Sequence, residues 1–121
     1  MTINWITIKV NDLKKSKEFY RNFLEMKIEK EFSPNNSMDI VFLGANNGIK
    51  IELIYDKNLQ VEYPVNNIIS IGICSSNYDE MLHNFQQKNM VANGPLILGG
   101  NMECFFVNDP NGVAIQIIKE K

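Results

Sequence analysis

The chain contains one segment twice. Residues 38–54 read MDIVFLGANNGIKIELI, and residues 102–118 read MECFFVNDPNGVAIQII, in register and without a gap. Six of the paired positions are identical, including Phe42 with Phe106 and both residues of the Asn-Gly pairs. A duplication of this length indicates two copies of one supersecondary unit. Function in such proteins usually lies where the copies face each other, so the positions at which the copies differ are informative.

The first copy is predicted to be a β-α-β-β-β unit. Apolar residues alternate with polar ones over 6–10, which is typical of a half-buried strand. Asp12 is placed to cap a helix whose apolar residues recur at helical spacing through Glu25. Further strands are expected at 26–32, 38–43 and 49–55, with Asn46-Asn47-Gly48 as a hairpin turn and residues 56–67 as the connection to the second copy.

The second copy repeats this order. Alternation over 69–74 predicts a strand, and Asn77 with Glu80 resembles a capping box before a helix that contains Met81, Leu82 and Phe85. Loops are expected at Asn93-Gly94-Pro95 and Gly99-Gly100, a type I turn with a glycine bulge at 109–112, and a last strand at 113–118. The repeat offset is 65 residues at the helix starts and 64 afterwards, which suggests that one residue was lost between the second helix and the next strand. The predicted fold class is α+β, with repeats at about 3–55 and 68–118 inside a single domain, 1–121.

Size and charge exclude several classes of function. A chain of 121 residues can bury a real core. Its net charge of −2 and lack of a basic cluster argue against nucleic acid as a partner. The apolar runs are too short to span a membrane, and the first ten residues read as a strand instead of a signal peptide. We therefore expect a cytoplasmic protein. Cys74 and Cys104 form no CxxC pair and are expected to be buried or pocket-wall thiols.

Several short motifs, in this order on a duplicated frame, resemble the vicinal oxygen chelate superfamily, which groups glyoxalases, bleomycin-resistance proteins and extradiol dioxygenases. The motifs are Val10-Asn11-Asp12-Leu13-Lys14-Lys15-Ser16, Phe19-Tyr20, Leu24-Glu25-Met26, Phe105-Phe106-Val107-Asn108-Asp109-Pro110-Asn111-Gly112 and Ile115-Gln116-Ile117. Glu25 departs from the family, which commonly has glycine there, so a different cap or a left-handed backbone is expected.

The resemblance implies that the two units curve their sheets into an open cup that holds the ligand, with helices outside. It also implies a divalent metal bound by four positions, which in this sequence are Trp5, Glu52, Ser70 and Gln116. These side chains are a poor ligand set. Indole offers only an N–H donor, and hydroxyl and carboxamide oxygens are weak ligands for transition metals, so only Glu52 is a good ligand. The single histidine, His83, is expected on the outer face of the second helix.

Strand alternation predicts which side chains face the cup. Glu52 is notable because a carboxylate between Ile51 and Leu53 is costly to bury alone. It should reach solvent, pair with Lys9 or Lys50, or bind ligand. The candidate substrate-binding residues are Trp5, Thr7, Phe42, Glu52, Ser70, Cys104, Phe106 and Gln116. For Trp5, Phe42 and Phe106 the competing interpretation is a role in the core.

The leading hypothesis is a metal-independent small-molecule-binding protein without a cofactor, similar to the bleomycin-resistance branch and homodimeric, which sequesters an antibiotic or binds a metabolite. One alternative is a lyase, isomerase or dioxygenase-type enzyme. That enzyme would use one divalent metal, or would be metal-free with Glu52 as the catalytic base. The other alternative is an interaction protein whose cup is filled by its own side chains.

Overall fold

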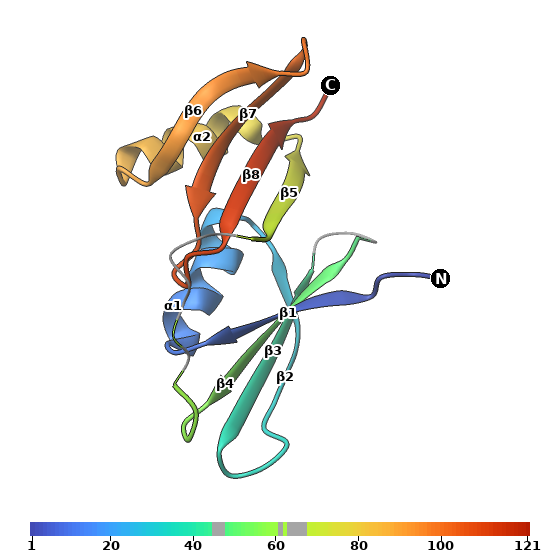
Figure 1. Cartoon of the computed structure of the whole chain (residues 1–121), viewed down its shortest axis with the longest axis vertical. Coiled ribbons are helices and arrows are strands. Elements are labelled where there is room, and N and C mark those ends of the chain that lie inside the picture. Colours follow the sequence, from blue (N-terminus) through green and yellow to red (C-terminus); the bar gives the residue numbers. More distant parts are fainter. Residues whose placement is uncertain (45–47, 61, 63–67) are drawn as a thin grey trace. The chain divides into compact units, whose positions relative to one another are not determined.

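A computed structural model describes residues 1–44, 48–60, 62 and 68–121, and in them the order β-α-β-β-β occurs twice (Figure 1). The chain divides into two compact units, Met1–Glu62 and Tyr63–Lys121. The first contains β1 (Trp5–Val10), α1 (Leu13–Glu18), a π-helical turn η1 (Phe19–Phe23), β2 (Lys27–Phe32), β3 (Met38–Gly44) and β4 (Lys50–Asp56). The second contains β5 (Ser70–Ser75), α2 (Tyr78–Gln87), β6 (Val91–Leu98), β7 (Met102–Asn108) and β8 (Ala114–Lys119). The predicted duplication is confirmed, whereas the assignment of both units to a single domain stays a prediction.

Each unit forms a four-stranded mixed sheet with the same topology. The strand orders are β1-β4-β3-β2 and β5-β8-β7-β6, and only the first pair in each sheet is parallel. The predicted neighbours in the hairpins are confirmed: Phe42 lies opposite Glu52, and Phe106 opposite Gln116. The register matters for function because it decides which side chains share a face of each sheet.

The turn at 109–112 fixes the register of the second unit. The Gly112 amide donates to the Asp109 carbonyl at 3.1 Å, and Gly112 has a φ of 86°, as the predicted turn with a glycine bulge requires. The buried Asp109 carboxylate also accepts hydrogen bonds from the amides of Asn111 and Val113, both at 2.8 Å. In the first unit Asn46 and Asn47, which belong to the predicted hairpin turn, lie outside the described residues. So do residues 61 and 63–67 of the predicted connection.

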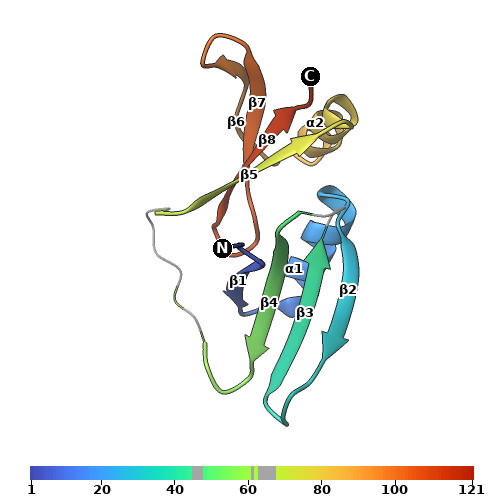
Figure 2. The same ribbon diagram turned by 90° about the vertical axis from the view of Figure 1, so that its right-hand side faces the viewer.

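One face of each sheet packs against the helix of its own unit. In Figure 2, α1 is seen behind β3 and β4 of its sheet, and α1 contacts β4. In the second unit the Phe105 ring packs edge-on against Tyr78 and Phe85 of α2, with centroids 5.3 and 5.8 Å apart. The residues buried to 2% exposure or less on these faces include Val10, Val41, Leu43, Leu53, Val107, Ile115 and Ile117. The opposite face of each sheet is left for other roles. Within the described ranges, no helix is long and apolar enough to span a membrane.

The first helix ends earlier and less regularly than predicted. Asp12 caps it as expected, because its carboxylate accepts a hydrogen bond from the Lys15 amide at 3.0 Å. The α-helical part stops at Glu18, and the chain continues as the π-helical turn η1 up to Phe23. Glu25 then adopts a φ of 58°, so of the two alternatives expected here, a different cap or a left-handed backbone, the second occurs.

The π-helical turn explains the change in repeat offset. Asn89 ends the second helix with a φ of 56°, so it is the counterpart of Glu25. Glu25 lies thirteen residues after its N-cap, Asp12, whereas Asn89 lies twelve after Asn77. The extra residue of the first unit is therefore accommodated inside the helix as a π-turn. The prediction that the difference lies between the second helix and the next strand was wrong.

Two further sequence predictions were wrong in the second unit. Asn77 is the N-cap of α2, but its side chain makes no capping hydrogen bond, so the capping box with Glu80 does not form. Asn93-Gly94-Pro95 is not a loop but part of β6, where the register shifts twice. A proline is compatible with this strand because β6 is at the sheet edge, and Gly94 has a φ of 107°.

Candidate functional site

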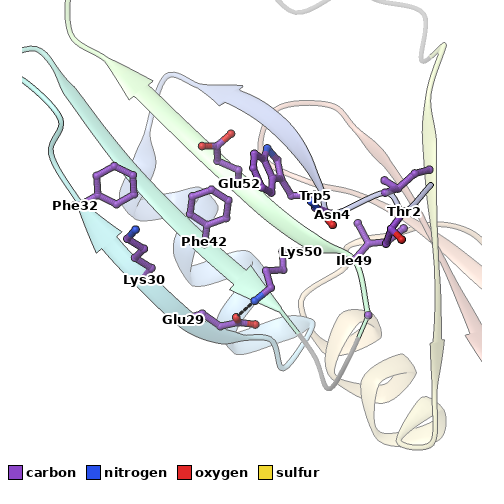
Figure 3. A pocket seen from close by; sticks show the side chains of 12 residues that line it. Thr2, Asn4, Trp5, Glu29, Lys30, Phe32, Phe42, Ile49, Lys50 and Glu52 are labelled. Atoms are coloured by element: carbon purple, nitrogen blue, oxygen red, sulfur yellow. Dashed lines mark hydrogen bonds and ion pairs between the residues drawn. The ribbon is translucent and has the colours of Figure 1, made fainter.

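A cavity of about 960 Å³ lies on the face of the first sheet that is turned away from α1 (Figure 3). Its wall comes from all four strands of this sheet and from residues 2–4, just before β1. Three predicted site residues, Trp5, Phe42 and Glu52, line it. The cavity is therefore built within the first unit, and it brings together three of the four site residues predicted in this unit.

The cavity wall includes three aromatic rings. Trp5 meets Phe42 edge-on, with centroids 5.4 Å apart, and Phe42 is stacked nearly parallel to Phe32 at 6.5 Å. Trp5 is 49% exposed and Phe32 is 37% exposed, so neither ring is buried in the core. Exposed aromatic surface in a concave site is suited to packing against a flat apolar ligand.

Glu52 is the polar counterpart of this wall. Its side chain comes from the middle of β4, and the residue is only 9% exposed. Thr7, the neighbour of Glu52 on the parallel strand β1, donates its hydroxyl to Glu52 Oε1 at 2.6 Å. This short bond to a carboxylate helps to explain how the group is tolerated. Thr7 thus supports Glu52 and is not itself part of the cavity wall.

Lys50 does not pair with Glu52, which was one of the predicted possibilities. Its ammonium group instead forms an ion pair with Glu29 of β2 (Figure 3). Gly44 of β3 lies close to this pair: a Cβ at Gly44 would overlap the Glu29 carboxylate, so a side chain there would displace this flexible group. Both members of the pair line the cavity.

A β-bulge in β2 places two consecutive charged residues beside the cavity. Ile28 lies opposite Leu43 and Lys30 opposite Phe42, so Glu29 is the extra residue on its strand. In a regular strand Glu29 and Lys30 would point to opposite faces, but here both line the cavity. Sequence reasoning missed both residues and Phe32. Alternation could place Lys30 and Phe32 on one face of β2, but it would place Glu29 on the other. Gly44 was the one local signal that a close approach occurs here.

The remaining predicted site residues belong to the second unit. Gln116 pairs with Phe106 on one side and with Gly72 on the other, so it shares a sheet face with both. Its side-chain amide donates to the Cys104 sulfur at 3.4 Å, and Cys104 has no exposed surface. That burial disfavours direct contact between Cys104 and a ligand. Ser70 is exposed on β5.

Both cysteines are free thiols. Cys104 is buried, whereas Cys74 is exposed, so the prediction that Cys74 is buried was wrong. Cys74 and Cys104 flank Ile118 on opposite sides. They are therefore two strand spacings apart, about 10 Å, which is too far for a disulfide without backbone movement.

Tyr78, the first residue of α2, has a perturbed acidity. Burial, and after it the nearby Glu103 carboxylate, which disfavours the phenolate, together raise the pKa of Tyr78 to about 12. Among the described residues, its hydroxyl has no hydrogen-bond partner of standard geometry, and Glu103 lies beside it without meeting that geometry. Its buried ring packs edge-on against Phe105, which indicates a structural role.

The side chains at the four family metal positions do not fit a catalytic metal. The Trp5 indole packs on Phe42, and its nitrogen can only donate. The Glu52 carboxylate accepts the Thr7 hydroxyl, and the Gln116 amide donates to Cys104. His83 is exposed on α2, as predicted. In the part of the chain that the structure describes, no three His, Cys, Asp or Glu side chains are grouped so that they could hold a metal ion.

Comparison with known proteins agrees with this architecture. The model of the Glyoxalase/Bleomycin resistance protein/Dioxygenase superfamily matches residues 2–117. A lactoylglutathione lyase from Salmonella typhimurium is 28% identical over 121 residues, covering 94% of this chain and 89% of the relative. The structure of glyoxalase I from Leishmania major superposes with a TM-score of 0.80 at 25% identity, covering 99% of this chain and 87% of that one.

A more distant structure shares only the fold. A glyoxylase/bleomycin resistance protein/dioxygenase domain from Frankia has a TM-score of 0.75 at 14% identity, covering 100% of this chain and 93% of the other. The duplicated β-α-β-β-β units, the family motifs and the match over residues 2–117 lead to one conclusion. The chain belongs to the glyoxalase/bleomycin resistance protein/dioxygenase superfamily.

Proposed function

We propose that the chain binds a small aromatic molecule without a metal, at the cavity of the first unit. The observation that carries this proposal is the wall itself, where Trp5 and Phe42 present their rings beside the carboxylate of Glu52. Sites for small molecules typically combine apolar walls with a few convergent polar groups. Sequestration of an antibiotic and binding of a metabolite would both use such a site.

The indole of Trp5 is better suited to stacking against a bound ligand than to coordinating a metal ion. Trp5 stands where the family resemblance implies a metal ligand, and it supplies a ring face instead of a donor atom. A planar ligand can stack on that face, while Glu52 accepts a hydrogen bond from the ligand. Thr7 occupies one lone pair of Oε1, and an ionised carboxylate has about four acceptor sites, so Glu52 keeps capacity for a ligand.

The chain provides its own reporter for this proposal. Trp5 is the single tryptophan, so tryptophan fluorescence, excited selectively over the four tyrosines, comes from the cavity wall. Titration with aromatic antibiotics and metabolites should quench or shift this emission saturably. A ligand at 100 times its Kd should stabilise the folded protein by about 2.7 kcal/mol, which is about 10 °C in Tm for a chain of this size.

A matched pair of variants localises the effect. Trp5→Ala should abolish ligand-induced stabilisation, whereas Ile97→Ala, which removes an exposed apolar side chain of the second unit, should leave it unchanged. Stoichiometric, tightly held Zn, Ni, Mn or Fe in the purified protein would contradict the metal-independent proposal. So would a full aromatic library that leaves the emission of Trp5 untouched.

An enzyme is the second candidate, and the similarity to lactoylglutathione lyase favours it. In a metal-free form the buried Glu52 would act as the base, held in place by Thr7. Turnover of lactoylglutathione by the metal-stripped protein, lost in Glu52→Gln and kept in Thr7→Ser, would favour this function over binding alone. A homodimer is our expectation for either function, and light scattering of the purified protein tests it.

A further inference from the structure

The cavity wall carries one negative and one positive side chain, Glu52 and Lys30, that do not form an ion pair with each other. Four charged residues line it, and two of them, Glu29 and Lys50, pair with each other. Among the described residues, Glu52 accepts a hydrogen bond from the neutral hydroxyl of Thr7 and takes part in none of the ion pairs. Among the residues that the structure describes, Lys30 takes part in no ion pair, and its ammonium group lies 4.7 Å from the centroid of the Phe32 ring.

The register places these two charges at opposite ends of one aromatic ring. Lys30 lies opposite Phe42, and Phe42 lies opposite Glu52, so the three side chains form a row across β2, β3 and β4. Figure 3 shows Glu52 and Lys30 on either side of the Phe42 ring. Two strand spacings separate their backbones by about 10 Å, a span that a para-substituted benzene ring can bridge with its substituents.

The bulge in β2 creates this arrangement. It directs both Glu29 and Lys30 to the cavity, and Glu29 then pairs with Lys50 in the space left by Gly44. Lys50 is thereby neutralised, and Lys30 remains the available cation. The result is a negative end at Glu52, an aromatic middle and a positive end at Lys30.

We propose that the cavity selects aromatic ligands that carry a protonated amine at one end and an anionic group at the other. Glu52 receives the amine, Phe42 and Trp5 contact the ring, and Lys30 receives the anion. This inference rests on the proposed aromatic-binding function and adds the ligand class. The two ends contribute unequally, because Glu52 is nearly buried and Lys30 is exposed.

Four probes of matched shape test the charges separately: 4-(aminomethyl)benzoate, 4-methylbenzylamine, 4-methylbenzoate and 4-methylbenzyl alcohol. Their Kd values come from titrations of Trp5 fluorescence in the full chain. Relative to the neutral alcohol, the amine of 4-methylbenzylamine should lower the Kd by about tenfold or more, as expected for a hydrogen bond to a buried charge. The carboxylate should tighten binding about two- to fivefold, and that gain should shrink at high salt.

Variants assign each gain to a residue. Glu52→Gln should remove the advantage of the amine, and Lys30→Gln the advantage of the carboxylate. Lys27→Gln is the control for Lys30→Gln, because Lys27 is an exposed lysine of β2 that does not line the cavity. Glu29→Gln should act in the opposite direction, since it frees Lys50 and should strengthen binding of the two carboxylate probes about two- to fivefold.

The outcomes separate the two proposals. If the four probes bind equally, or if Lys30→Gln and Lys27→Gln act alike, the charge selection is overturned and aromatic binding stands. If only the neutral alcohol binds, the charge selection is overturned in the same way. If no probe changes the emission of Trp5, the ligand class is overturned, and the wider library then decides the proposed function.

Discussion

Replacement of Thr7 by valine tests how the chain tolerates the carboxylate of Glu52. Valine has nearly the same shape and suits a strand, so Thr7→Val removes the hydroxyl with little change in packing. Glu52 would lose its 2.6 Å hydrogen bond while staying 9% exposed. A hydrogen bond to a charged group contributes about 1.5–3 kcal/mol, so we expect a loss of about 2 kcal/mol in the free energy of unfolding.

Urea unfolding followed by circular dichroism measures this loss directly, and thermal unfolding should show a decrease of about 8 °C in Tm. Thr7→Ser is the matched control, because it keeps the hydroxyl and should cost less than about 1 kcal/mol. A double-mutant cycle with Glu52→Leu isolates the pair. Replacing both partners by apolar groups should be far less costly than the sum of the single changes, with a coupling of about 1.5 kcal/mol or more.

Two results would refute this reasoning. Thr7→Val could cost less than about 0.5 kcal/mol, which would mean that water replaces the hydroxyl at no loss. Alternatively, its cost could be unchanged in the Glu52→Leu background, which would assign the effect to something other than the pair.

Three further predictions concern the second unit. Tyr78→Phe should leave stability unchanged or raise it by about 1 kcal/mol, because a buried hydroxyl without a standard hydrogen bond is removed; a loss above 1 kcal/mol in urea would contradict this. The pKa of Tyr78 is about 12 in the folded chain and about 10 in the unfolded chain, so its contribution to stability is complete below pH 10 and is lost progressively between pH 10 and 12, by up to about 2.7 kcal/mol. Over this pH range the free energy of unfolding of the wild type should therefore fall relative to that of Tyr78→Phe. Parallel pH dependences of the two proteins would count against the shift. Asp109→Ala should cost about 2–4 kcal/mol, because two backbone amides and the Asn111 side chain lose their acceptor, whereas Asp56→Ala, which frees one exposed amide, should cost under 1 kcal/mol.

The duplicated β-α-β-β-β order and much of the strand register could be predicted from the amino-acid sequence. Local signals were sufficient for this, because alternation of period two marks a strand and the turn at 109–112 fixes which residues face each other. The pairings of Phe42 with Glu52 and of Phe106 with Gln116 followed from that logic. The left-handed backbone at Glu25 was one of two alternatives expected from the residue that stands where the family has glycine.

Sequence patterns gave wrong predictions where a strand or helix contains an extra residue or a local irregularity. The π-turn at Phe19–Phe23 absorbs an extra residue without a proline or glycine to mark it. In β6, Asn93-Gly94-Pro95 reads as a loop, yet the strand continues because an edge strand tolerates bulges and a missing amide.

Only the tertiary structure decided the polar part of the site. The sequence identified Trp5, Phe42 and Glu52, but not the partners that determine how they can act. Thr7 comes to Glu52 from 45 residues away, and Lys50 turns to Glu29 instead. The bulge that brings Glu29 and Lys30 to one face is a property of two paired strands, so no pattern within β2 alone could reveal it. The residue types of a site can be read from the chain, whereas its charge balance depends on which side chains the register brings together.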